Sequence, residues 1–256
     1  MSMSQEQNPK TGEQTPNTEL LDPADAVRHL AQRQSKLIES ELNVLQKSGG
    51  AVSCRAGCAA CCRQFVVVSP IEALAIEQQV RSADRAQRRR WEAAHARHGK
   101  ALARHPSLMR RLQAFRAARG YLSPGEGDAL EREYWAVQIV CPFLEKERCT
   151  IYAARPFACR EHFAVTPSEW CACDLDAVQT PPTRFEFRAI AGQIGEGCFG
   201  LEDRLVPLFE AVTYATERRE AGKRTAPLSA VTRLLEVALT RVMTWRRMVQ
   251  NDWAGR

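Results

Sequence analysis

Apolar residues recur at helical spacing near both ends of the chain. The segment from Asp22-Pro23 to Gly49-Gly50 has them three or four positions apart, which predicts one amphipathic helix that ends at the glycines. These positions are Val27, Leu30, Leu37, Ile38, Leu42 and Leu45. A second stripe comprises Leu228, Val231, Leu235, Ala238, Leu239, Val242 and Val249, and a weaker one precedes it at Leu205, Leu208, Phe209 and Val212. We expect these last two helices to pack as a pair.

The middle of the chain mixes short extended pieces with helices. The β-branched run 65–68 predicts a short strand, and Ser69-Pro70-Ile71-Glu72 has the spacing of a capping box, so a helix should begin at Pro70. Residues 84–119 are rich in helix formers, with a break at His105-Pro106. A loop with glycine and proline is expected from Gly120 to Gly127.

Two extended pieces follow, at 138–141 and 149–152, joined by the charged segment 145–148. This pattern predicts a β-hairpin that brings Cys141 and Cys149 close together.

These elements predict a mainly α fold, with helices around a small irregular cysteine-rich core and a short hairpin. Three parts are expected: a disordered tail at 1–21, a metal-binding domain at 22–200 with a basic helical insertion at about 84–119, and a C-terminal helical pair at 201–256. No run reaches the roughly 18 apolar residues of a membrane span, and the first residues lack the pattern of a signal peptide. We therefore expect a cytoplasmic protein without a membrane partner.

Positive charge is concentrated in the insertion. The chain has a formal net charge of +6, and residues 84–119 hold eleven Lys or Arg against two acidic residues, Asp84 and Glu92. Such a segment would attract phosphates or an acidic partner, but a charged helix is more often a solvated face. Because the five tryptophans are scattered, nucleic-acid binding through 85–119 is not the expected function.

The ten cysteines change the picture most. Four of them lie within nine residues, at Cys54, Cys58, Cys61 and Cys62. In a reducing compartment such spacing indicates metal ligands rather than disulfides, because thiolates bind zinc and iron–sulfur clusters well. In extended backbone Cys61 and Cys62 would point to opposite sides, which predicts either that one of them is not a ligand or that there are two metals.

Three more cysteines stand in a recurring context: Cys141-Pro-Phe-Leu, Cys149-Thr-Ile-Tyr, and Cys159 within Arg155-Pro-Phe-Ala-Cys-Arg160. Together with the CxxxCxxCC group, they make residues 54–175 resemble the CxxCxxCC family, whose members are described as zinc- or iron-chelating. The resemblance implies a ligand set of Cys54, Cys58, Cys61, Cys62, Cys141, Cys149 and Cys159. It also implies one further cysteine, matched here by Cys171 or Cys173.

Other side chains have weaker claims to the site. His162 follows Cys159 by three residues and would offer a nitrogen ligand, although an isolated histidine is more often ordinary. Arg155 and Arg160 would donate hydrogen bonds to thiolates or form surface ion pairs. Cys198 lies outside the shared pattern and is expected to fill the core.

Chelation of zinc or iron, including a [4Fe-4S] cluster, is the function that these features favour. Two alternatives stay open. The resemblance implies a link to lysine N-methylation of flagellin, for which the cluster needs a cavity beside it, and a reactive thiolate near arginine would suit a redox sensor. No Gly-rich turn marks a S-adenosylmethionine pocket, and the C-x3-C-x2-C spacing of radical enzymes stands without their alternating strands and helices.

Overall fold

The computed structural model of the chain describes residues 19–55, 57–180 and 185–254, with side chains described up to 244. The tail predicted at 1–21 therefore lies almost entirely outside the described residues. The described part is mainly α, as predicted, and its strands form three short antiparallel pairs.

The first helix confirms the sequence prediction. Helix α1 spans Pro23–Lys47, and the Asp22 side chain accepts a hydrogen bond of 2.8 Å from the Asp25 amide at its first turn. Ahead of it, β1 (Leu20–Leu21) pairs with β6 (Ala226–Pro227). This pairing ties the start of α1 to the start of the last helix.

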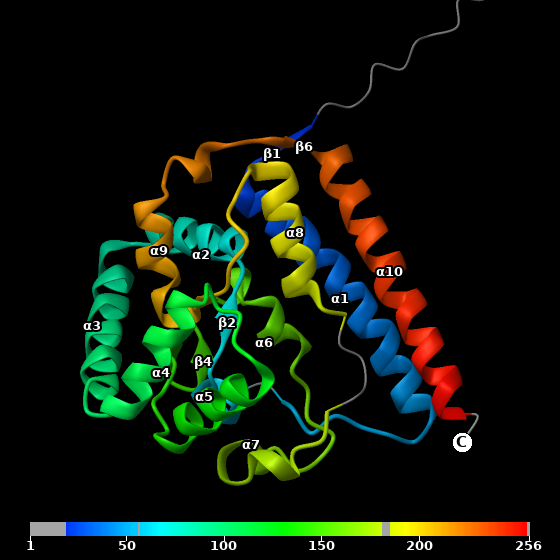
Figure 1. Ribbon diagram of the computed structural model, residues 1–256, viewed down its shortest axis with the longest axis horizontal. Coiled ribbons are helices and arrows are strands. Elements are labelled where there is room, and N and C mark those ends of the chain that lie inside the picture. Colours follow the sequence, from blue (N-terminus) through cyan, green and yellow to red (C-terminus); the bar gives the residue numbers. More distant parts are fainter. Residues whose placement is uncertain (1–18, 56, 181–184, 255–256) are drawn as a thin grey trace, which may run out of the picture.

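The main core lies between α1 and four other helices: α2 (Pro70–Ser82), α8 (Phe187–Phe199), α9 (Ala211–Glu217) and α10 (Leu228–Ala254). Helix α2 begins at Pro70 as predicted. It packs on α1, α8 and α9, while α10 runs beside α8 and α1 (Figure 1). The two C-terminal helices thus pack mainly on different helices, not on each other as expected. The short α9 uses its apolar face against α2.

A second, smaller core packs residues of the basic insertion against Val67, Leu130, Tyr134 and Ile139. Helices α3 (Arg85–Leu102) and α4 (Pro106–Ala117) confirm the predicted helices and the break at His105. Helix α5 (Pro124–Ala136) was missed, because residues 120–127 were expected to be a loop. Ser123-Pro124-Gly125-Glu126 is a capping box of the same kind as the one at Ser69, and its side chains make the same contacts.

Short elements complete the fold. Strand β2 (Val67–Val68) pairs with β5 (Val206–Pro207). The 3-10 turns are η1 (Ala60–Arg63), η2 (Tyr152–Ala154), η3 (Leu175–Ala177), η4 (Leu208–Glu210) and η5 (Ala221–Lys223), and two short helices are α6 (Phe157–Glu161) and α7 (Trp170–Cys173).

The predicted hairpin exists, but its strands lie elsewhere. Strand β3 (Leu144–Glu145) pairs with β4 (Arg148–Cys149), so Leu144 rather than Cys141 stands opposite Cys149. Lys146 and Glu147 have φ of 49° and 58°, the left-handed backbone that a tight two-residue turn requires. The turn therefore shortens the hairpin and leaves Cys141 just before it.

Across the described residues, no helix combines the length and apolar character that crossing a membrane would require.

Candidate metal centre

Backbone hydrogen bonds bring the cysteine segments together. The Cys141 amide donates to the Cys62 carbonyl at 2.8 Å, and the Ser53 amide donates to the Ala164 carbonyl at 2.8 Å. The Ala164 amide in turn donates to the Cys54 sulfur at 3.3 Å. The first cysteine group is thereby tied to the start of the hairpin segment and to the chain that follows α6.

Cys61 and Cys62 do not lie in extended backbone, as the sequence argument assumed. Both belong to the 3-10 turn η1, and their side chains are hydrogen-bonded to each other. This bond lowers the pKa of Cys61 and raises the pKa of Cys62. The adjacent thiols therefore face a common region, and the argument from opposite sides does not hold.

Cys61 stands at the electrostatic centre of the group. Burial is the largest cause of the raised pKa of Cys54, Cys141, Cys149, Cys159 and Cys171, and the negative charge of Cys61 raises each of them further. For Cys62 the hydrogen bond to Cys61 comes first, and the charge of Cys61 adds to it. Cys58 acts in the same direction on Cys54 and Cys171. Eight cysteines from three stretches of chain thus lie within range of one another's charge.

Burial makes several of these thiols hard to ionise. It is the first cause of the raised pKa of Cys141, to about 12, and of Cys171, to about 11. Burial also raises the pKa of Cys159. Since metals bind thiolates, a cation has to supply the charge that makes ionisation favourable here. A set of buried thiols that repel one another when charged fits a soft metal ion.

The metal-free protein is expected to lose stability at alkaline pH. An unfolded thiol ionises at about 8.5, whereas Cys171 and Cys141 are held to about 11 and about 12 in the fold. The unfolded chain then releases protons first, so the stabilisation present below the unfolded pKa disappears as pH rises through the folded values. Urea unfolding of chelator-treated protein from pH 7 upward measures this. A flat profile would contradict it.

The two arginines influence the thiols in different ways. Arg155 lies over the Tyr152 ring, 5.9 Å from its centroid, and its charge lowers the pKa of Cys54, Cys61, Cys149 and Cys159. Arg160 donates through Nε to the Arg155 carbonyl at 2.8 Å and through Nη2 to two further carbonyls. Arg155 thus acts on four thiols by its charge, whereas Arg160 acts in this way on Cys149 and also holds the turn that carries Arg155.

Cys171 and Cys173 lie in different surroundings. Cys171 is 3% exposed on α7, which packs on η1. Cys173 is exposed, and its thiol donates to the Glu169 carbonyl at 3.4 Å. Cys198 lies apart on α8, half-buried against the main core.

The thiols are donors of the type that soft metals prefer, but the described side chains are not arranged around an ion. Among residues 19–55, 57–180 and 185–254, no group of three or more Cys, His, Asp or Glu side chains stands as a formed metal site. The thiols therefore surround a common region without already occupying ligand positions.

A buried polar network holds the helix that carries Cys159. Glu72 is 2% exposed and accepts hydrogen bonds from the Ser69 amide and hydroxyl at 2.8 and 2.7 Å, and from the Phe157 amide at 2.8 Å. Gln34, which is 0% exposed, donates from Nε2 to the Phe157 carbonyl at 3.2 Å and to Glu161 at 2.9 Å. Hydrogen bonds with Gln34 on α1 and Glu72 on α2 therefore hold helix α6 in place.

Part of this network had a signal in the sequence. Gln34 continues the apolar stripe of α1 between Leu30 and Leu37, and a polar residue in such a position has to find a buried partner. The partners of Gln34, Phe157 and Glu161 on α6, are 123 and 127 residues away in the chain, so spacing alone did not reveal them.

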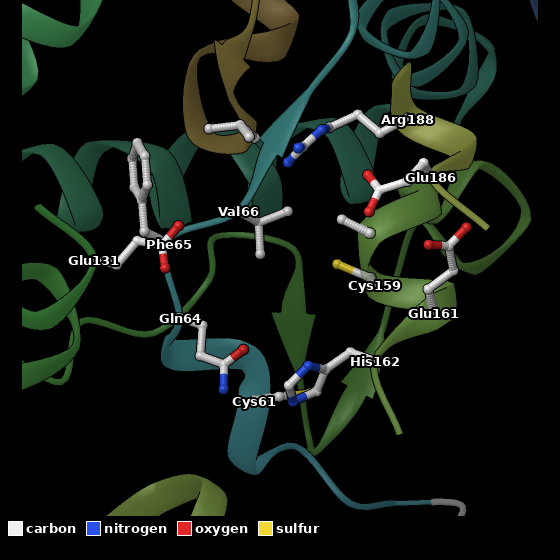
Figure 2. A pocket seen from close by; sticks show the side chains of 12 residues that line it. Cys61, Gln64, Phe65, Val66, Glu131, Cys159, Glu161, His162, Glu186 and Arg188 are labelled. Carbon is white, nitrogen blue, oxygen red and sulfur yellow. The ribbon is translucent and has the colours of Figure 1, made fainter. Parts of the chain in front are cut away.

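A cavity of about 200 Å³ opens beside Cys61 and Cys159 (Figure 2). Its other lining residues are Gln64, Phe65, Val66, Val67, Glu131, Ala158, Glu161, His162, Glu186 and Arg188. His162, the predicted nitrogen donor, lies near Cys61 at one end of the cavity. Sequence reasoning missed the carboxylates and Arg188, which come from α5, α6 and the start of α8.

Comparison with known proteins agrees with the cysteine pattern. Residues 53–176 match the CxxCxxCC family, described as "Putative zinc- or iron-chelating domain". Neither the curated proteins nor the solved structures gave a match. The matched segment contains the three converging stretches of chain, from Cys54 to Cys171, and also the basic insertion. Residues 53–176 thus belong to the CxxCxxCC family.

Proposed function

We propose that residues 53–176 bind zinc or iron through thiolates and that the metal fastens three separate stretches of chain to one another. The proposed ligands are Cys54, Cys58, Cys61, Cys62, Cys141, Cys149, Cys159 and Cys171. The observation that carries the proposal is the convergence of the cysteine segments: the Cys141 amide is bonded to the Cys62 carbonyl, the Ala164 amide to the Cys54 sulfur, and α7 packs on η1. Because such ligands have to stay reduced, the proposal implies a reducing compartment such as the cytoplasm.

The thiols form two groups that share Cys61. Cys54, Cys58 and Cys171 influence one another on one side. Cys62, Cys141, Cys149 and Cys159 do so on the other side. A single zinc ion takes four ligands, so eight thiols exceed its needs. The arrangement favours either more than one metal ion or an iron–sulfur centre, with Cys61 next to both groups.

When bound, the metal would supply positive charge and a cross-link between η1, the hairpin and α7. The chain's own residues set the conditions for this. Arg155 offsets the negative charge of several thiolates, the buried network behind α6 holds Cys159 in place, and α7 presents Cys171 toward η1. Such a site contributes folding free energy directly.

Metal analysis of protein purified without oxygen tests the proposal. We expect stoichiometric zinc or iron per chain, and loss of most of it in the Cys61→Ser, Cys62→Ser double variant, because this pair lies at the centre of the thiols. Visible absorption distinguishes the metals: an iron–sulfur centre is brown and zinc is colourless. Wild-type protein without either metal would sink the proposal.

The cavity beside Cys61 and Cys159 favours a second candidate, an iron–sulfur-dependent enzyme. A purely structural site needs no open side, whereas catalysis needs space for a substrate next to the metal. The same purification separates the two candidates, since the enzyme requires iron and a zinc-only protein would exclude it.

A further inference from the structure

The cavity has a distinct charge pattern. Three carboxylates line it, Glu131, Glu161 and Glu186, against one guanidinium, that of Arg188. In Figure 2, Glu161 and Glu186 lie on the side of Cys159, Glu131 lies across the cavity, and the Arg188 guanidinium reaches toward Val66. Oxygen donors therefore surround a space that also contains the thiols of Cys61 and Cys159.

A second, independent feature of the wall is the Gln64 amide. Its Nε2 is buried without a hydrogen-bond partner among the described residues, and Gln64 lines the same cavity close to Cys61. A buried donor without an acceptor is costly. The Gln64 amide therefore leaves an unpaired polar group on the cavity wall beside Cys61.

We infer that this cavity is the route by which a divalent cation reaches the buried thiols, with its carboxylates drawing the cation in and Arg188 opposing them. The inference rests on the proposed metal-binding function and adds the access path. Clefts lined by one sign of charge raise the local concentration of the opposite ion and its association rate. Carboxylate oxygens bind divalent ions weakly enough to pass them on to softer thiolates.

Glu161 is unsuitable for a test because it accepts hydrogen bonds from Gln34 and the Phe187 amide, at 2.9 and 3.1 Å. Glu131 and Glu186 are both exposed at the surface, so their replacement with glutamine should leave the fold intact. Arg188 offers a change of opposite sign in the same cavity. Glu236, exposed on α10, is the matched control for a lost negative charge elsewhere.

In the experiment, the full chain is treated with a chelator and then mixed with Co²⁺ by stopped flow. The thiolate-to-cobalt absorption is recorded over time and gives the loading rate. At low salt we expect the rate constant to fall about threefold in each of Glu131→Gln and Glu186→Gln and to rise about threefold in Arg188→Gln, from one charge acting on a divalent ion at close range. Glu236→Gln should match wild type. All rates should converge at high salt.

The outcomes separate this inference from the function beneath it. Equal amounts of bound Co²⁺ at equilibrium, with rates that shift in opposite directions, support the route. Equal amounts with unchanged rates in all cavity variants overturn the route and leave metal binding standing. If wild-type protein takes up no Co²⁺ at all, the proposed function itself fails. Thermal unfolding of each metal-free variant checks that the rate changes do not follow from loss of structure.

Discussion

Replacing Cys171 with serine is expected to weaken metal binding about 100-fold, whereas Cys173→Ser should leave it unchanged. A structural site gains on the order of 12 kcal/mol from about four thiolates, so one lost ligand costs about 3 kcal/mol, or roughly 100-fold. The charges of Cys54, Cys58 and Cys61 act on Cys171, which is buried, while Cys173 is exposed. Competition with a coloured chelator for Zn²⁺ measures both affinities.

Two residues apart on the same short helix, these cysteines form a matched pair. Cys198→Ser adds a control for a half-buried thiol outside the cluster. If Cys173→Ser weakens binding and Cys171→Ser does not, the ligand assignment is wrong. Equal losses in both would mean that α7 changes position when the metal binds.

The sequence was most informative where chemistry is local. The cysteine groups and their neighbours identified the family, and the capping residues at Asp22 and Ser69 placed helix starts at Pro23 and Pro70. The capping box at Ser123 was equally visible, but the nearby glycines favoured a loop. Glycine costs about 1 kcal/mol in a helix interior, which packing of Leu130 and Tyr134 on α4 offsets.

The sequence pattern could not predict which residues that are distant in the chain lie close together in the fold. The eighth cysteine was ambiguous because Cys171 and Cys173 have almost the same context, and only the packing of α7 on η1 distinguishes them. The cavity combines Glu131 from α5 with Glu186 and Arg188 from the start of α8, residues that no local period connects. Burial likewise decides the pKa of each thiol, and burial is a property of the fold.

Glu72→Ala is expected to cost about 3 kcal/mol of unfolding free energy and also to weaken metal binding. The change leaves three buried donors without their acceptor, at about 1–3 kcal/mol each: the Ser69 amide, the Ser69 hydroxyl and the Phe157 amide. The Phe157 amide begins the helix that carries Cys159. Loss of this bond should therefore displace a proposed ligand, which a purely structural defect elsewhere in the core would not do.

The chain contains its own control for this result. Glu126 occupies the same place in a Ser-Pro-x-Glu capping box, but it is exposed and accepts its hydrogen bonds from the amide and hydroxyl of Ser123. Glu126→Ala should change stability little and metal affinity not at all. Urea unfolding and Zn²⁺ competition on both variants decide the point. If Glu72→Ala lowers stability but keeps wild-type metal affinity and an unaltered Co²⁺ spectrum, the network holds the core together without positioning Cys159. If Glu72→Ala loses metal affinity together with stability, the two capping boxes differ in function although they are alike in sequence. The reason is that only the box at Ser69 is buried behind the cysteines.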